Sequence, residues 1–118
     1  MEKTDAVVAL AALAQDSRLD VFRLLVQAGP NGMPAGDVAE ALALPPNALT
    51  FHFDKLRMAG LVTVRREGRL MIYAARYETM NDLLAYLTEN CCGGDADACP
   101  PASCAPKPIR AKRAKATA

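Results

Sequence analysis

The residues best suited to chemistry are four cysteines that lie together near one end of the sequence. They are Cys91, Cys92, Cys99 and Cys104. Thiolates are soft ligands: three of them suit trivalent arsenic or antimony, whereas four suit a tetrahedral zinc or cadmium ion. Redox chemistry is also open, because Cys91 or Cys92 could pair with either of the later two. The spacing therefore predicts a thiol site and leaves its ligand undecided.

The adjacent pair Cys91 and Cys92 is the firm part of such a site. Gly93 and Gly94 follow it and would let the later chain fold back. A third thiolate could then come from Cys99 or from the other tail cysteine. Cys99 closes the shorter loop at slightly lower entropic cost, which favours it only weakly.

Length and composition predict one globular domain followed by a tail. The chain has 118 residues, of which 52% are hydrophobic and 23% charged, enough for a domain of roughly 100 residues. It has no run of about 18 apolar residues, so no transmembrane helix or membrane partner is expected. Residues 1–18 lack the basic start of a secretory signal. We therefore expect a cytoplasmic protein, in which clustered cysteines favour a metal or redox site over structural disulfides.

Positive charge is unevenly distributed along the chain. Residues 1–104 carry nine basic and thirteen acidic side chains, a net charge of −4. The other five basic residues are Lys107, Arg110, Lys112, Arg113 and Lys115. They could attract DNA non-specifically or form only a solvated tail. A globally basic nucleic-acid-binding surface is excluded, so any bound DNA must meet a local positive patch.

Residues 45–61 have the pattern of a short amphipathic helix. Asn47 is the predicted N-cap after two prolines, and Gly60 is predicted to end the helix. Leu49, Phe53 and Leu56 follow a 3.6-residue period and should face the core. The opposite, solvated face should carry Thr50, Phe51, His52, Asp54, Lys55 and Arg57.

This helix is the second half of a predicted helix-turn-helix, after a helix over residues 34–43 and a four-residue turn. Its first turns are where base contact is easiest. The predicted DNA-binding residues here are Asn47, Thr50, Phe51, His52, Lys55 and Arg57. Phe51 could touch a thymine methyl group. The alternatives are local packing for Phe51 and His52 and plain solvation for the charged residues.

A basic hairpin follows the helix-turn-helix. Residues 61–66 and 70–75 are β-prone, and Glu67-Gly68-Arg69 lies between them. Arg65, Arg66 and Arg69 concentrate positive charge at the tip of an otherwise acidic body. We expect this wing to contact phosphates or lie in a minor groove.

Three further helices complete the predicted domain, over residues 5–14, 17–28 and 78–90. The last has an apolar stripe of Met80, Leu83, Leu84 and Leu87, which reaches Cys91 if the helix continues. The composition then changes to Gly, Asp, Ala, Pro, Ser and Lys. We therefore expect a DNA-binding and dimerisation domain over residues 1–92 and a tail without regular structure over 93–118.

Two segments resemble the ArsR/SmtB family of bacterial winged-helix repressors. LAALAQDSRLDVFRLLVQAG (10–29) is similar to the family's opening, and PPNALTFHFDKLRMAGLVTVRREGRLMIYA (45–74) to its recognition helix and wing. Thr50 and Phe53 stand where the family most often has Ser and Leu. The resemblance implies a mainly α winged helix-turn-helix of order α-α-α-α-β-β-α. It also implies a homodimer, formed through the first and last helices, that releases double-stranded operator DNA when an inducer binds.

The inducer implied by the resemblance is trivalent arsenic or antimony. Residues 34–44 lack the cysteine box of one family branch, and the last helix lacks the histidine of the zinc sensors. The sequence LTENCC (87–92) instead resembles a subgroup whose arsenite site is a vicinal cysteine pair with a third cysteine in the tail. Inducer binding would reorder the end of the last helix and move the dimer away from its DNA-binding geometry.

Two other interpretations stay open. One is a cadmium- or zinc-sensing repressor that uses all four thiolates, and the other is a thiol redox or metalloid-carrier protein on a winged-helix scaffold. Enzymatic catalysis has no support in the sequence, which shows no nucleophile with a base at a recognisable spacing, no phosphate-binding loop and no cofactor motif.

Overall fold

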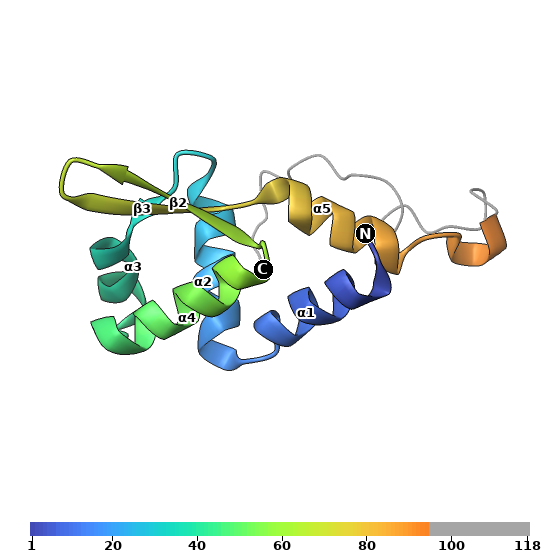
Figure 1. Cartoon of the computed structure of the whole chain (residues 1–118), viewed down its shortest axis with the longest axis horizontal. Helices are drawn as coiled ribbons and strands as arrows, with labels where there is room; N and C mark the ends of the chain where they lie inside the picture. Colours follow the sequence, from blue (N-terminus) through green and yellow to red (C-terminus); the bar gives the residue numbers. More distant parts are fainter. Residues whose placement is uncertain (95–118) are drawn as a thin grey trace. The chain divides into compact units, whose positions relative to one another are not determined.

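The computed structural model describes residues 1–94, and Figure 1 shows its elements in chain order. The elements are α1 (Lys3–Leu13), α2 (Asp16–Ala28), β1 (Met33–Pro34), α3 (Ala35–Leu42), α4 (Pro46–Met58), β2 (Val62–Glu67), β3 (Leu70–Ala75), α5 (Tyr77–Leu87) and the 3-10 helix η1 (Cys91–Gly94). This is the predicted winged helix-turn-helix. Cys99, Cys104 and the five basic tail residues lie outside the described residues.

The chain forms two compact units, Met1–Leu84 and a second that begins at Ala85, within α5. The predicted domain boundary after residue 92 involves residues beyond 94 and stays a prediction. None of the helices within residues 1–94 is long and apolar enough to span a bilayer.

The turn between α3 and α4 determines where α4 begins. Ala43 adopts a left-handed conformation (φ 53°), and the Leu44 N–H donates to the Ala39 carbonyl at 3.0 Å, which closes α3. Pro45 is the N-cap of α4 and Pro46 its first residue, where the missing N–H has no intrahelical partner to lose. The prediction of Asn47 as N-cap is therefore wrong, because a proline starts the helix earlier.

The inner stripe of α4 lies at the centre of the hydrophobic core. Leu49, Phe53 and Leu56 are each at most 2% exposed, as their spacing predicts. Phe53 also stacks on Tyr73 of β3, with ring centroids 3.6 Å apart and planes 4° from parallel. Other core residues are Val21, Leu25, Val38, Leu61 and Leu83. Each large side chain buried in this way stabilises the fold by about 1.5–3 kcal/mol.

The wing is a three-stranded antiparallel sheet in the order β1-β3-β2. Each residue of β2 pairs with one of β3, so Glu67 belongs to the strand and only Gly68 and Arg69 form the turn. Gly68 takes the positive φ (64°) that such a turn requires. The sequence did not predict β1, because two residues that include Pro34 show no alternation.

The last helix is shorter than predicted. α5 starts at Tyr77, whose hydroxyl donates to the Val26 carbonyl at 2.9 Å and so ties α5 to α2. It ends at Leu87 rather than residue 90, and Asn90 has a left-handed conformation (φ 56°). Cys91 therefore does not continue the apolar stripe of α5, because the chain turns before reaching it.

We predict that Gly32 and Gly36 respond oppositely to alanine. Gly32 has φ 76°, and an added Cβ would overlap the Tyr73 carbonyl oxygen, so Gly32→Ala should lower the free energy of unfolding by at least about 2 kcal/mol. Gly36 lies in α3 with open space around it, so Gly36→Ala should raise the free energy of unfolding by up to about 1 kcal/mol. Urea unfolding measures both. Equal effects of the two changes would contradict the close approach of Gly32 to β3.

Candidate DNA-binding surface and cysteine pair

The outer side of α4 presents a recognition face, which we define as Asn47, Thr50, Phe51 and Lys55. All four side chains are exposed, Phe51 to 54%. The Thr50 hydroxyl donates to the Pro46 carbonyl at 3.0 Å. Arg57 is exposed as well, and it forms an ion pair with Asp54 at 3.6 Å. Polar, cationic and aromatic groups thus lie together on one exposed face, which matches the needs of base and phosphate contact.

Phe51 is flanked by two cations. The Lys55 ammonium lies 5.3 Å from the ring centroid and the Arg18 guanidinium 6.0 Å from it. Cations at these distances are attracted to the face of an aromatic ring. The two contacts limit the positions that Phe51 can take, and they keep an apolar surface between positive charges.

His52 does not lie on the outer face where the sequence placed it. It is 8% exposed and packs beside Phe51, with the two rings edge to face. Its Nδ1 lies 3.4 Å from Nη1 of Arg18. Because arginine only donates, Nδ1 must accept, so the imidazole is neutral in this contact. Burial and the neighbouring Arg18 charge both lower the pKa of His52. A DNA contact from His52 stays a prediction.

Arg18 was not predicted as a site residue. It lies in the family-like segment 10–29, but nothing in its spacing indicates contact with residue 52. Its Nε donates to the Ala12 carbonyl of α1 at 2.7 Å. A contact between residues this far apart in sequence becomes visible only in the fold.

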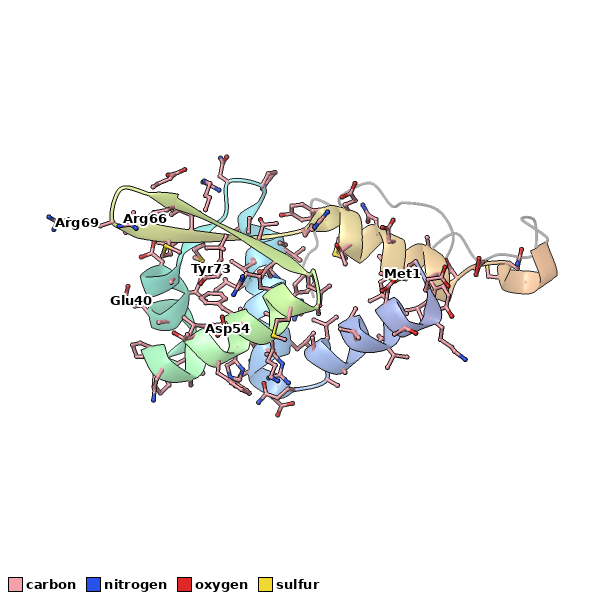
Figure 2. All side chains as sticks on the ribbon, viewed as in Figure 1. Met1, Glu40, Asp54, Arg66, Arg69 and Tyr73 are labelled. Atoms are coloured by element: carbon pink, nitrogen blue, oxygen red, sulfur yellow. The ribbon has the colours of Figure 1, made fainter. Side chains whose placement is uncertain are left out.

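The three wing arginines differ in how they are held. Arg65 donates to the Glu67 carboxylate at 2.6 Å and to the Asn31 carbonyl at 2.8 Å, and Arg66 to the Gly68 carbonyl at 3.1 Å. Arg69 projects from the hairpin tip (Figure 2). Within residues 1–94 its side chain makes no hydrogen bond or ion pair, unlike those of Arg65 and Arg66. Arg69 is therefore the wing cation that can approach a phosphate at no cost in existing contacts.

The cysteine pair lies in the second unit, after the end of α5. Cys91 is half-buried and Cys92 exposed. Four of the residues here, Asn90, Cys92, Gly93 and Gly94, have positive φ. Desolvation raises the pKa of Cys92, and the charge of Cys91 and a hydrogen bond with it raise it further. Within residues 1–94 no group of three His, Cys, Asp or Glu side chains could hold a metal ion. The described chain thus supplies two adjacent thiols.

Comparison with known proteins identifies the fold's family. A model described as a helix-turn-helix domain matches residues 13–65. The transcriptional activator HlyU of Vibrio cholerae is 36% identical over 75 residues, which are 62% of this chain and 67% of HlyU. An ArsR-like transcriptional regulator from Rhodococcus sp. RHA1 has a solved structure that superposes with a TM-score of 0.64 at 25% identity, covering 74% of this chain and 78% of that one. The chain belongs to the ArsR family of winged-helix transcriptional regulators. HlyU has also been solved in reduced form, with a TM-score of 0.58 at 33% identity, over 71% of this chain and 88% of that one.

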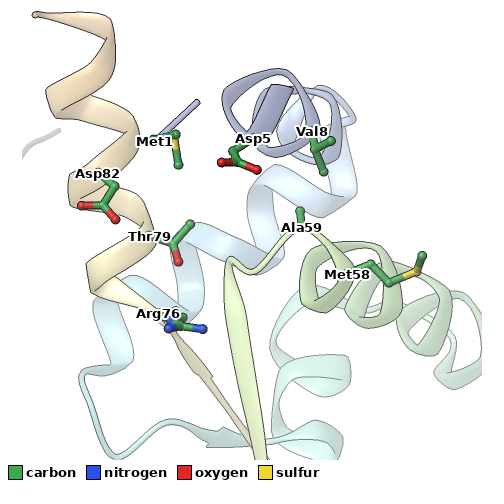
Figure 3. Close-up of a pocket in the computed structure, with 8 residues that line it drawn as sticks. All are labelled: Met1, Asp5, Val8, Met58, Ala59, Arg76, Thr79 and Asp82. Atoms are coloured by element: carbon green, nitrogen blue, oxygen red, sulfur yellow. The ribbon is translucent and has the colours of Figure 1, made fainter. Parts of the chain in front are cut away.

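In this ArsR-family fold, a hollow of about 400 Å³ lies between α1, the end of α4 and the start of α5 (Figure 3). Its lining residues are Met1, Asp5, Val8, Met58, Ala59, Arg76, Thr79 and Asp82. Met58 is 78% exposed, and α1 exposes Val7, Val8 and Leu10 beside it. This surface reaches the recognition face, because Val8 and Met58 also line a second hollow with Lys55.

We predict that Arg69 and Arg76 differ in their effect on the salt dependence of DNA binding. Arg69→Ala should reduce the slope of log K against log salt concentration by about 0.9, because it removes one phosphate contact. Arg76, which follows β3 at the far end of the hairpin from the tip, is the matched control, and Arg76→Ala should leave the slope unchanged. Fluorescence anisotropy with the DNA upstream of the protein's own gene measures both. An unchanged slope in Arg69→Ala would exclude the wing tip from the phosphate contacts.

Proposed function

We propose that this ArsR-family regulator is a cytoplasmic, homodimeric repressor that binds operator DNA and releases it when trivalent arsenic or antimony binds its cysteines. The observation that carries the proposal is the adjacent thiol pair, Cys91 and Cys92, directly after the last helix of a winged helix-turn-helix. These two thiols could form part of a site for a soft metal or metalloid. Next to a DNA-binding domain, such a site suits a sensor in which ligand binding changes the affinity for DNA.

The exposed surface of α1 supports the dimer. Val7, Val8 and Leu10 are between 42% and 57% exposed, although they are apolar. A second copy that covers this face would remove it from water, which would stabilise the dimer by about 25 cal/mol per Å² of apolar area buried. Two recognition helices would then enter successive major grooves of an operator with dyad symmetry, with the wings on the flanking phosphates.

The thiols fit arsenite by their chemistry. Each thiol can replace one hydroxyl of arsenous acid and release one water, so three thiols make a three-sulfur site with no net release of protons. Cys91 and Cys92 supply two of these thiols, and Cys99 or Cys104 would supply the third. A zinc or cadmium ion would instead displace a proton from each thiol, so its affinity would fall steeply with falling pH.

A redox regulator is the second candidate. The relative HlyU has been studied in reduced form, and this chain carries four cysteines within 14 residues, 91–104. Oxidation of Cys91 or Cys92 to a disulfide with a tail cysteine would change the same segment that arsenite would. The two candidates differ in what releases the DNA, an oxidant or a metalloid.

The experiment that tests the proposal is a mobility-shift assay with the upstream DNA, in the presence of a reductant. Arsenite should weaken binding by about 5- to 150-fold, the usual size of coupling between two sites. Cys92→Ser should keep DNA binding and lose this response. If the protein does not bind the DNA, or arsenite under reducing conditions does not release it, the proposed function is wrong.

Serine variants of the tail cysteines distinguish the ligand sets. In a three-sulfur site one of Cys99→Ser and Cys104→Ser keeps the arsenite response and the other loses it. In a four-thiolate site both variants weaken the response, and zinc or cadmium is the effective ligand. Release by a thiol oxidant alone, with no effect of arsenite, would favour the redox regulator.

A further inference from the structure

Arg18 lies where three helices of the first unit meet. From α2, its Nε donates to the Ala12 carbonyl of α1 at 2.7 Å, and its Nη1 lies 3.4 Å from Nδ1 of His52 on α4. Its guanidinium is also 6.0 Å from the ring centroid of Phe51, on the recognition face. One side chain therefore connects the end of α1 to the first half of α4.

We propose that Arg18 is a positioning residue that fixes the orientation of the recognition helix relative to α1, and so sets the separation of the two recognition helices in the dimer. The inference rests on the proposed function, because it requires a homodimer formed through α1. A rotation of α4 about this contact would move both recognition faces relative to the operator half-sites, whose spacing is fixed by the DNA helix.

The contact with α1 suits a guanidinium. Ala12 lies in the last turn of α1, where carbonyls have no intrahelical partner. No basic residue of α1 itself lies in that turn, so Arg18 supplies the cation that a helix C-terminus favours. A guanidinium also offers donors in a rigid fork and can meet two acceptors at once, whereas a lysine ammonium is a single point charge.

The contact with α4 requires a neutral His52. The charged groups near the Phe51–His52 edge are Arg18 from α2 and Lys55 from α4, and α1 contributes the Ala12 carbonyl through Arg18. Burial and Arg18 hold the pKa of His52 below its ordinary value. The contact is therefore intact above the ordinary histidine pKa of about 6.5. It is lost as the pH falls through the lower pKa of the folded protein, because protonation removes the acceptor and places a second cation beside Arg18.

Operators of altered spacing test the proposal with the full-length protein. The DNA probes are the operator found by footprinting upstream of its gene, the same operator with one base pair added between half-sites, and a single half-site. Arg18→Gln should lower affinity for the native operator by about tenfold and for the half-site by less than about twofold. It should also reduce the preference for native over lengthened spacing. Arg23→Gln, an exposed change on the same helix, is the control.

The outcomes separate the inference from the proposed function. If wild-type protein binds the operator and arsenite releases it, but Arg18→Gln keeps the full spacing preference, the inference is wrong and the function stands. Equal losses on operator and half-site by a folded Arg18→Gln would also overturn it, since they indicate that Arg18 acts within each half-site and not on their spacing. If Arg18→Gln does not fold, Arg18→Lys is used for the same test, because lysine keeps the positive charge and lacks the forked donors of the guanidinium.

A second readout uses His52, the chain's single histidine. Wild-type spacing preference should hold at pH 6.5 and above. It should fall only as the pH drops through the lowered pKa of His52 in the folded protein. His52→Asn keeps an acceptor near the Nδ1 position and does not titrate, so its spacing preference should be independent of pH in this range. His52→Leu removes the acceptor and should reproduce the Arg18→Gln spacing profile at every pH. A wild-type preference for the native half-site spacing that does not change with pH would contradict the proposed role of the Arg18–His52 contact.

Discussion

The DNA-binding surface depends on the burial of one stripe of α4. Leu49, Phe53 and Leu56 are almost fully buried, and the Phe53–Tyr73 stack fastens the helix to the wing. Once this stripe is fixed, the helical period sends Thr50, Phe51 and Lys55 outward. A loss of core packing would therefore disorder the recognition face and the wing together, because they share the same contact.

The charge of the body imposes a second constraint. Residues 1–104 have a net charge of −4, so DNA affinity cannot come from a general attraction by this part of the chain. Positive groups are instead held at a few places: Arg65 donates to Glu67 and Asn31, and Lys55 lies against the Phe51 ring. Such local contacts favour binding in one register over non-specific binding.

The sequence predicted the elements that follow a clear local pattern. The stripe of α4, the hairpin with its glycine turn and the order of helices all appear as expected, because period and turn chemistry are local signals. The misplaced start of α4 and the missed β1 involve prolines, for which rules of capping and alternation are weak. His52 was misplaced for another reason: a polar residue three positions after Leu49 can face the core if it finds a partner, and that partner, Arg18, is distant in sequence. The predicted end of α5 was too late because the apolar spacing in the sequence continues from Leu87 to Cys91, whereas the backbone turns before Cys91.

The cysteine site could be predicted only in part. The pair Cys91 and Cys92 is adjacent in sequence and needs no fold to bring it together, whereas the choice between Cys99 and Cys104 depends on residues beyond 94. The thiols belong to the second compact unit and the recognition face to the first. A sensor of this kind requires that the ligand bind the two DNA-binding states with different affinity.

The coupling between arsenite binding and DNA binding tests that requirement most directly. The affinity of arsenite for the reduced protein should be determined by calorimetry, once with the protein alone and once with the protein saturated by operator DNA. Arsenite should bind the DNA-bound protein more weakly, and by the same factor by which arsenite weakens DNA binding, because coupling between two sites is reciprocal. Equal arsenite affinity with and without DNA would contradict the account, however tightly arsenite binds.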